Sequence, residues 1–207
     1  MKIDLARCPL VVIGSWNHAI FTPPWVERNL LTGPETVTVE LGFGPQGLVS
    51  QFHSGPIQFT SAPGRVSFVP STVDDSTFKA MEASARQLLS RLPETPISAI
   101  GINFGFDVPE RAESVEGLLT TNDQGLLGDN GIEVEATLLK RRMQFEQRVF
   151  NLSVSREAGE AVRIDFNFHY NVADPEEAAD KVDGAVLVAR DVAIQALEDL
   201  YGLRLED

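Results

Sequence analysis

Cysteine is almost absent from the 207-residue sequence, which contains Cys8 alone. A single cysteine cannot form an intrachain disulfide, and such sparse use is typical of a reducing compartment. Long apolar runs are also missing, because no window approaches the roughly 18 uninterrupted apolar residues of a membrane-spanning helix. The first residues, with Lys2, Asp4 and Arg7 before a short apolar run, do not have the pattern of a signal peptide. We therefore expect a cytoplasmic protein without a membrane partner.

Positive charge is scarce in this sequence. It has 17 lysines and arginines against 30 aspartates and glutamates, which gives a formal net charge of −13. A field of this sign repels phosphate backbones and anionic lipid headgroups and favours solubility. We therefore expect no nucleic-acid partner.

Motifs of known chemistry are lacking as well. His18, His53 and His169 each stand alone in their segments, and no His-x-x-x-His or Cys-x-x-Cys spacing occurs. The glycine-rich segments have no phosphate-loop Gly-Lys-Ser/Thr, and no Gly-x-Ser-x-Gly nucleophile elbow is present. The sequence thus predicts no metal site, no cofactor and no catalytic residue. It leaves enzymatic activity open while favouring a non-enzymatic protein.

The strongest strand pattern lies at residues 97–108. Apolar residues alternate there with small or polar ones, which is the period-2 pattern of a half-buried strand. The apolar set is Ile100, Ile102, Phe104, Phe106 and Val108, and the other set is Ala99, Gly101, Asn103, Gly105 and Asp107. Two glycines on one strand face indicate that another part of the chain, or a ligand, approaches that face closely.

The sequence also indicates an internal repeat. Residues 9–14 (Pro-Leu-Val-Val-Ile-Gly) and 96–101 (Pro-Ile-Ser-Ala-Ile-Gly) share proline, isoleucine and glycine at matching positions. We therefore predict two repeat halves, residues 1–95 and 96–207, that form one cooperative domain. Each half is expected to contain a strand, a helix, four strands and a second helix.

Periodicity and turn residues give the expected elements. In the first half they are a strand at 9–21, a helix at 22–31, strands at 37–41, 48–53, 57–60 and 66–69, and a helix from Ser76 that Pro93 ends. In the second half they are a strand at 97–108, a helix at 109–119, a loop at 122–131, a strand at 132–139, a dense stretch at 139–155 broken near 141–147, a strand at 162–172, and one long helix between Asp174 and Gly202.

This order resembles the duplicated fold of the TATA-binding protein. The resemblance implies an α+β fold in which a curved, mainly antiparallel sheet has its long helices on one face. It implies no DNA binding, because the net charge of −13 contradicts the basic concave face that such binding uses. Residues 100–104 (Ile-Gly-Ile-Asn-Phe), with 162–168 before a long helix, also resemble a sporadically distributed family of uncharacterised bacterial proteins. That family usually has an arginine and an aromatic residue where this chain has Ile102 and Asn103.

The strand at 162–172 has one polar face. Residues two apart on a face are about 6.6 Å apart along a strand, so Asp165 lies about 13 Å from His169 and cannot orient it as a catalytic partner. The polar residues of this face, called the polar stripe below, form either a solvated sheet face or a polar binding surface. The candidate ligand- or partner-binding residues are Asn103, Asp107, Arg142, Arg148, Arg163, Asp165, Asn167 and His169.

A basic cluster stands out in this acidic chain at residues 140–142 (Lys-Arg-Arg), with Arg148 close by. Such a cluster binds a phosphate or a carboxylate, or it pairs with acids on neighbouring strands. The nearby acids favour the pairing, and they are Glu133, Glu135, Glu146 and Glu157.

Two hypotheses for function follow from the sequence. We expect a non-enzymatic protein-interaction or assembly module, whose partner is another protein and which is a monomer or a homodimer. The alternative is a small-ligand-binding protein, or an enzyme, with a pocket between the sheet and the long helices.

Overall fold

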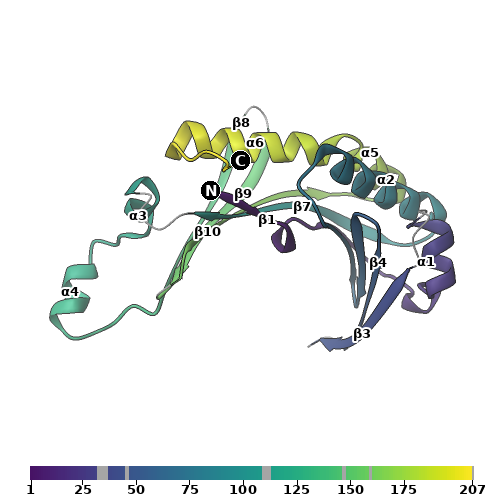
Figure 1. Cartoon of the computed structure of the whole chain (residues 1–207), viewed down its shortest axis with the longest axis horizontal. Helices are drawn as coiled ribbons and strands as arrows, with labels where there is room; N and C mark the ends of the chain where they lie inside the picture. Colours follow the sequence, from purple (N-terminus) through teal and green to yellow (C-terminus); the bar gives the residue numbers. More distant parts are fainter. Residues whose placement is uncertain (32–36, 45–46, 109–112, 146–147, 159, 207) are drawn as a thin grey trace.

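The computed structural model describes residues 1–31, 37–44, 47–108, 113–145, 148–158 and 160–206. Over these residues the chain is an α+β protein with a large, curved, antiparallel sheet (Figure 1). The first part of the chain forms β1 (Lys2–Asp4), the 3-10 turn η1 (Leu5–Arg7), β2 (Leu10–Gly14), the 3-10 turn η2 (His18–Ile20), α1 (Pro23–Asn29), β3 (Thr38–Gly44), β4 (Gly47–Ser54), β5 (Ile57–Ala62), β6 (Arg65–Pro70) and α2 (Asp75–Arg91). The second part forms β7 (Ile97–Val108), α3 (Glu113–Leu119), α4 (Gln124–Asp129), β8 (Ala136–Phe145), β9 (Arg148–Glu157), β10 (Val162–Asn171), α5 (Pro175–Val182) and α6 (Ala185–Tyr201).

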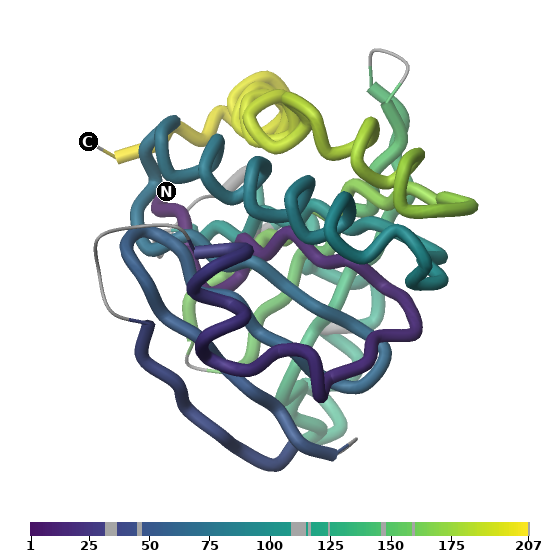
Figure 2. Tube along the Cα trace, turned by 90° about the vertical axis from the view of Figure 1, so that its right-hand side faces the viewer, coloured from purple at the N-terminus to yellow at the C-terminus, as the bar shows by residue number. Residues whose placement is uncertain are grey.

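Strand order places β2 and β7 side by side near the middle of the sheet. The order is β3-β4-β5-β6-β2-β7-β10-β9-β8, and β1 pairs with β7 beyond the end of β2. The outer strands on both sides of the sheet curve away from α2, α5 and α6 (Figures 1 and 2). These three helices lie together over the convex face of the sheet. In the described part of the chain, the concave face of the sheet therefore has no long helix over it, and β3 and β8 are the outer strands.

The core lies between the sheet and the helices on the convex side. The apolar residues of β7, from Ile100 to Val108, are at most 1% exposed, so this strand supplies the middle of the core. Phenylalanine rings fill much of the layer; those that are almost completely buried are Phe52, Phe59, Phe68, Phe78, Phe104, Phe106, Phe150, Phe166 and Phe168.

The strand expected at residues 9–21 is shorter than predicted, because β2 ends at Gly14. Gly14 pairs with Ile97 after a register shift, and the amide of Ser15 donates to the carbonyl of Pro96. Since β7 begins at Ile97, β2 has no further partner on that side. The strand expected at 132–139 begins only at Ala136, because Ala136 pairs with Glu157, the last residue of β9. The expected loop at 122–131 contains α4.

The long C-terminal helix is in fact two helices, α5 and α6. The break occurs at Gly184, whose φ of 66° lies in the left-handed region that favours glycine. The N-terminus of α6 receives its acceptor from another helix, since the amide of Val186 donates to Oε1 of Glu82 on α2 at 2.6 Å. The dense stretch at 139–155 divides as expected, with β8 ending at Phe145 and β9 beginning at Arg148.

Candidate functional site

The polar stripe predicted for β10 lies on the concave face of the sheet. It runs beside the sparse face of β7, because Arg163 pairs with Asp107, Asp165 with Gly105, Asn167 with Asn103, and His169 with Gly101. The alternate residues of β10, such as Phe166 and Phe168, point into the core. The structure thus brings six of the eight candidate residues together on two neighbouring strands.

Three asparagines form a hydrogen-bonded row across this face. Nδ2 of Asn103 donates to the carbonyl of Pro9 at 2.9 Å, and Nδ2 of Asn167 donates to Oδ1 of Asn103 at 2.8 Å. Nδ2 of Asn151 on β9 then donates to Oδ1 of Asn167 at 3.2 Å. On β8, Arg142 pairs in register with Asn151, so a seventh candidate residue lies at the outer end of this row. Asn151 was not among the predicted site residues, although its place on a strand facing β10 could have indicated it.

An ion-pair cluster occupies the centre of the concave face. The guanidinium of Arg7, on the 3-10 turn η1, donates to Asp4 at 2.7 Å, to Asp107 at 2.5 Å and to Asp165 at 2.9 Å. Three carboxylates around one guanidinium leave excess negative charge at this point. Arg7 and Asp4 were not among the predicted site residues, because the strand partners of Arg7, Asp107 and Asp165, lie 100 and 158 positions away in the sequence.

The cluster changes the titration of its members. Burial raises the pKa of Asp165, while the charge and hydrogen bond of Arg7 oppose that rise. Burial alone lowers the pKa of Arg7, but the hydrogen bond to Asp4 and the charges of the three carboxylates outweigh it and raise this pKa overall. The guanidinium therefore stays charged and neutralises part of the local negative charge.

The glycines of β7 make room for other parts of the chain. A Cβ on Gly105 would lie 2.4 Å from Cβ of Arg7, which real Cβ atoms essentially never approach, so η1 requires glycine there. A Cβ on Gly101 would lie 3.3 Å from Nδ2 of Asn167, at the end of a side chain. The sparse face of β7 therefore reflects internal packing at Gly105 and a milder contact at Gly101.

The remaining candidates have separate surroundings. Nε2 of His169 lies 3.1 Å from Oδ1 of Asn171, and Arg163 donates to Glu160 at 2.6 Å. Arg148 does not join the stripe, because alternation along β9 puts it on the same side as the buried Phe150. There its charge opposes the rise that burial causes in the pKa of Tyr170.

The basic cluster lies on β8, an outer strand. Lys140, Arg141 and Arg142 are exposed and face Ser153, Leu152 and Asn151 of β9, none of which is an acid. Within the described ranges these three cations form no ion pair. The expected pairing with Glu133, Glu135 or Glu157 is therefore not formed, and Glu146 lies outside the described residues.

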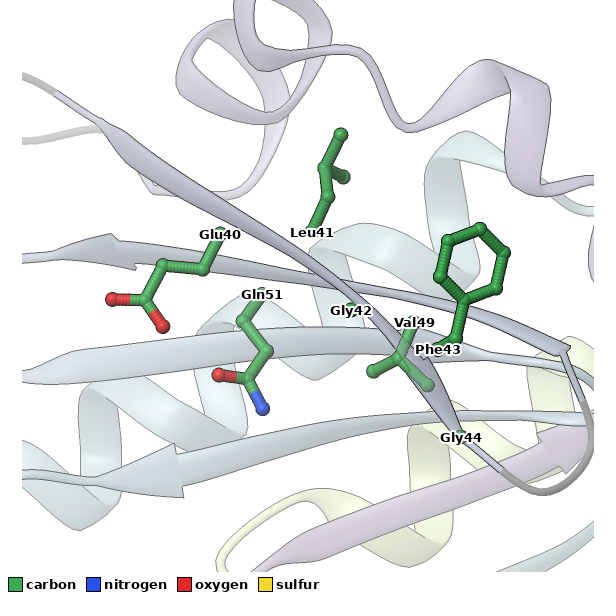
Figure 3. A pocket seen from close by; sticks show the side chains of 7 residues that line it. All are labelled: Glu40, Leu41, Gly42, Phe43, Gly44, Val49 and Gln51. Atoms are coloured by element: carbon green, nitrogen blue, oxygen red, sulfur yellow. The ribbon is translucent and has the colours of Figure 1, made fainter.

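The surface hollows lie away from the polar stripe of β10. One of about 250 Å³ lies at the β3–β4 hairpin and is lined by residues 40–44 with Val49 and Gln51 (Figure 3). Another of about 330 Å³ lies between the end of α2 and the start of α5, and Leu89, Pro93 and Pro175 are among its lining residues. Among the residues that the structure describes, no group of three or more His, Cys, Asp or Glu side chains is arranged to hold a metal ion.

No helix in the described part of the chain has the length and apolar character needed to cross a membrane. No model of a known protein family matches the chain, and no curated protein and no solved structure matches it either.

Proposed function

We propose that this protein is a non-enzymatic protein-interaction module that binds an extended, acidic segment of another protein along the outer strand β8. The observation that carries this proposal is the basic cluster of β8. Its three cations lack an acidic partner in the described part of a chain whose net charge is −13.

The position of β8 supports binding by strand addition. Among the described strands, β8 is the last in the order and pairs with β9 alone, so the described sheet does not use the main-chain groups of its other edge. An extended peptide adds to such an edge through main-chain hydrogen bonds, while its side chains meet alternate side chains of the edge strand. Main-chain pairing provides affinity, and the side chains provide selectivity.

The side chains of β8 determine which segment fits. Lys140 and Arg142 share the concave face, and Arg141 lies on the opposite face, so both faces of an added strand would meet a cation. A segment in which acidic and apolar residues alternate sets its acids on the concave face, toward Lys140 and Arg142. Its apolar side chains then lie on the opposite face, where alternation along β8 places Leu139 and Met143 beside Arg141.

Edge cations have a second known use, which is to keep foreign strands away from a sheet. That use applies to strands that are neutral or basic, and it predicts no affinity for an acidic strand. The alternative function, a ligand-binding or enzymatic pocket between sheet and helices, has less support because buried phenylalanine rings fill much of that layer.

We also propose that the two halves, residues 1–95 and 96–207, are duplicated units arranged as in the TATA-binding protein. The strand order supports this, because β6, β5 and β4 follow β2 outward on one side while β10, β9 and β8 follow β7 outward on the other. Helices occupy matching places in the chain, since α2 comes after β6 and α5 comes after β10. Among the described residues of the second half, no strand corresponds to the outer strand β3.

A labelled peptide tests the proposed function. The probe is an eight-residue peptide of alternating glutamate and valine, and its lysine–valine counterpart is the negative control. We expect fluorescence anisotropy to show binding of the acidic peptide alone, and to show that binding weakens steeply with added salt. The double variant Lys140→Glu, Arg142→Glu should lose at least tenfold in affinity.

The matched control variant is Lys79→Glu, which reverses an exposed charge on α2, far from β8 in the strand and helix order. It should bind the acidic peptide nearly as the wild type does. Equal binding of both peptides, or undiminished binding by the β8 double variant with a native melting curve, would contradict the proposed function.

A further inference from the structure

The opposite edge of the sheet, β3, has a different character. Its seven residues, Thr38–Gly44, contain no proline and a single charged residue, Glu40. Leu41 is 71% exposed and Phe43 is 88% exposed, and Leu48 on β4, which pairs with Phe43, is 48% exposed. Apart from Glu40, β3 lacks the charges and prolines with which proteins usually prevent strand pairing, and its register with β4 is regular.

The two faces of β3 differ completely. Leu41 and Phe43 project to one side, whereas Glu40 projects to the other side together with Val49 and Gln51 of β4 (Figure 3). Gly42 and Gly44 have no side chain on that second side, and this leaves the hollow of about 250 Å³ beside Glu40. One face of β3 is thus apolar, and the other has one acid, Glu40, and two glycines without side chains.

We propose that β3 pairs antiparallel with β3 of a second copy of this chain, with Leu41 on the two-fold axis. In this register Leu41 faces Leu41 of the second copy, and Val39 faces Phe43 of the second copy. On the other face, Glu40 lies opposite Gly42 of the second copy and Thr38 lies opposite Gly44. All seven residues of the strand are then paired, and two sheets join into one.

Self-complementarity identifies a second copy as the occupant. In a two-fold interface, each residue of β3 must fit the residue that lies opposite it on β3 of the second copy. On one face of this pairing, apolar residues meet only apolar residues. The single acid meets a glycine, and the hollow beside that glycine has room for a carboxylate side chain. A register centred on Glu40 would instead set two like charges opposite each other, which is destabilising.

The net charge of −13 on each copy opposes this association at long range. Added salt screens that repulsion and leaves the apolar contacts in place, so dimerisation should strengthen as salt is raised. This is the opposite of the salt dependence expected for acidic peptides at β8. The β3 pairing does not depend on the proposed function at β8, and the salt response distinguishes the two.

Sedimentation velocity over a range of concentrations and salt tests the proposal. We expect a monomer–dimer equilibrium that shifts toward dimer at higher salt, and a loss of dimer in Leu41→Lys, which sets two cations opposite each other. Because Leu41 is exposed, this variant should keep the wild-type far-UV spectrum and melting curve. Sedimentation as a monomer under all conditions, or an unchanged dimer in Leu41→Lys, would overturn the proposal.

Disulfide trapping tests the register. Residues directly opposite in an antiparallel pair have Cα atoms about 4.5–5.5 Å apart, which suits a disulfide. Leu41→Cys should therefore cross-link to its copy on mild oxidation. Phe43→Cys is the matched control, because its copy lies four residues along the strand, about 13 Å away. The native Cys8 is buried and does not compete. We expect at least tenfold more covalent dimer for Leu41→Cys, and equal cross-linking of the two variants would refute the register.

Discussion

Nη1 of Arg7 donates to Oδ1 of Asp165 at 2.9 Å, across 158 positions of the chain. The bond connects the 3-10 turn η1 to strand β10 and passes over Gly105 of β7, the strand next to β10. It thereby fixes the position of η1 relative to β7 and β10 on the concave face.

Replacing Arg7 with methionine should destabilise the protein by about 1–2 kcal/mol at neutral pH, because three carboxylates then lose their common cation. The loss should be smaller at pH 4. Removing the cation raises the pKa of Asp165 further, so the variant binds extra protons in the folded state and loses stability as pH rises above about 3.9, the unfolded value. Urea unfolding at both pH values measures this effect.

The matched control for that measurement is Arg86→Met, which removes an exposed cation of α2 that is paired with Asp183 away from the cluster. Exposed pairs of this kind contribute little, so its stability should change by less than about 0.5 kcal/mol. An Arg7→Met variant that behaves like this control would show that the cluster does not stabilise the fold.

Alanine at Gly105 should cost about 1–3 kcal/mol, because its Cβ forces the turn η1 away from β7. Alanine at Gly101 should cost less than about 1 kcal/mol, since its nearest neighbour is the end of the Asn167 side chain and strand propensity improves. Thermal and urea unfolding of the two variants provide the comparison. Equal costs at the two positions would contradict the packing explanation.

Glu82 should make stability depend on pH. Burial raises its pKa from the ordinary 4.5, although the amide of Val186 opposes that rise. A raised folded pKa means that stability is present below the unfolded pKa and is lost as pH rises through the folded one. Glu82→Gln keeps an acceptor for Val186 without the charge, so its stability relative to the wild type should increase as pH rises from about 4.5 to 8.

Two further variants complete the Glu82 experiment. Glu82→Ala leaves the amides of α6 without that acceptor and should lose about 1–3 kcal/mol at every pH. Glu198→Gln removes an exposed charge from α6 and should show no comparable trend with pH. A Glu82→Gln variant whose relative stability falls or stays flat over this range would contradict the assignment.

The two halves should unfold in a single transition, as expected for one cooperative domain. Trp16 and Trp25 both lie in the first half, so tryptophan fluorescence reports that half, whereas far-UV circular dichroism reports the whole chain. Coincident melting curves from the two probes are the expected result, because β2 and β7 are paired across the boundary between the halves. Curves that separate by several degrees would show that the halves unfold independently.

The sequence predicted those features that local pattern controls. Alternation identified β7 to the residue, and it placed Asp165, Asn167 and His169 on one face of β10. It could not reveal that Arg7 crosses Gly105, because that contact depends on which strands become neighbours. The available signal was that Gly105 has no side chain on this strand face. It indicated a close approach but did not identify the approaching residue.

Strand order also explains the remaining differences. Whether a basic run such as residues 140–142 is paired depends on the residues of the facing strand, and β9 presents a serine, a leucine and an asparagine there. The break in the C-terminal helix depends on Gly184, whose left-handed backbone a helical pattern does not distinguish from a tolerated glycine. The exposure of Leu41 and Phe43 became visible only once β3 was known to be an outer strand.

The central place of β7 has a consequence for the order in which the chain folds. Its earlier partners, β1 and β2, precede it in synthesis, but β10, which covers its other edge, is made more than fifty residues later. A growing chain therefore presents a long, apolar, half-paired strand until β10 emerges. Pairings between residues so distant in sequence slow folding and expose chains to aggregation. Refolding should accordingly be slow for a protein of this size, and most sensitive to substitutions on the face where β7 meets β10.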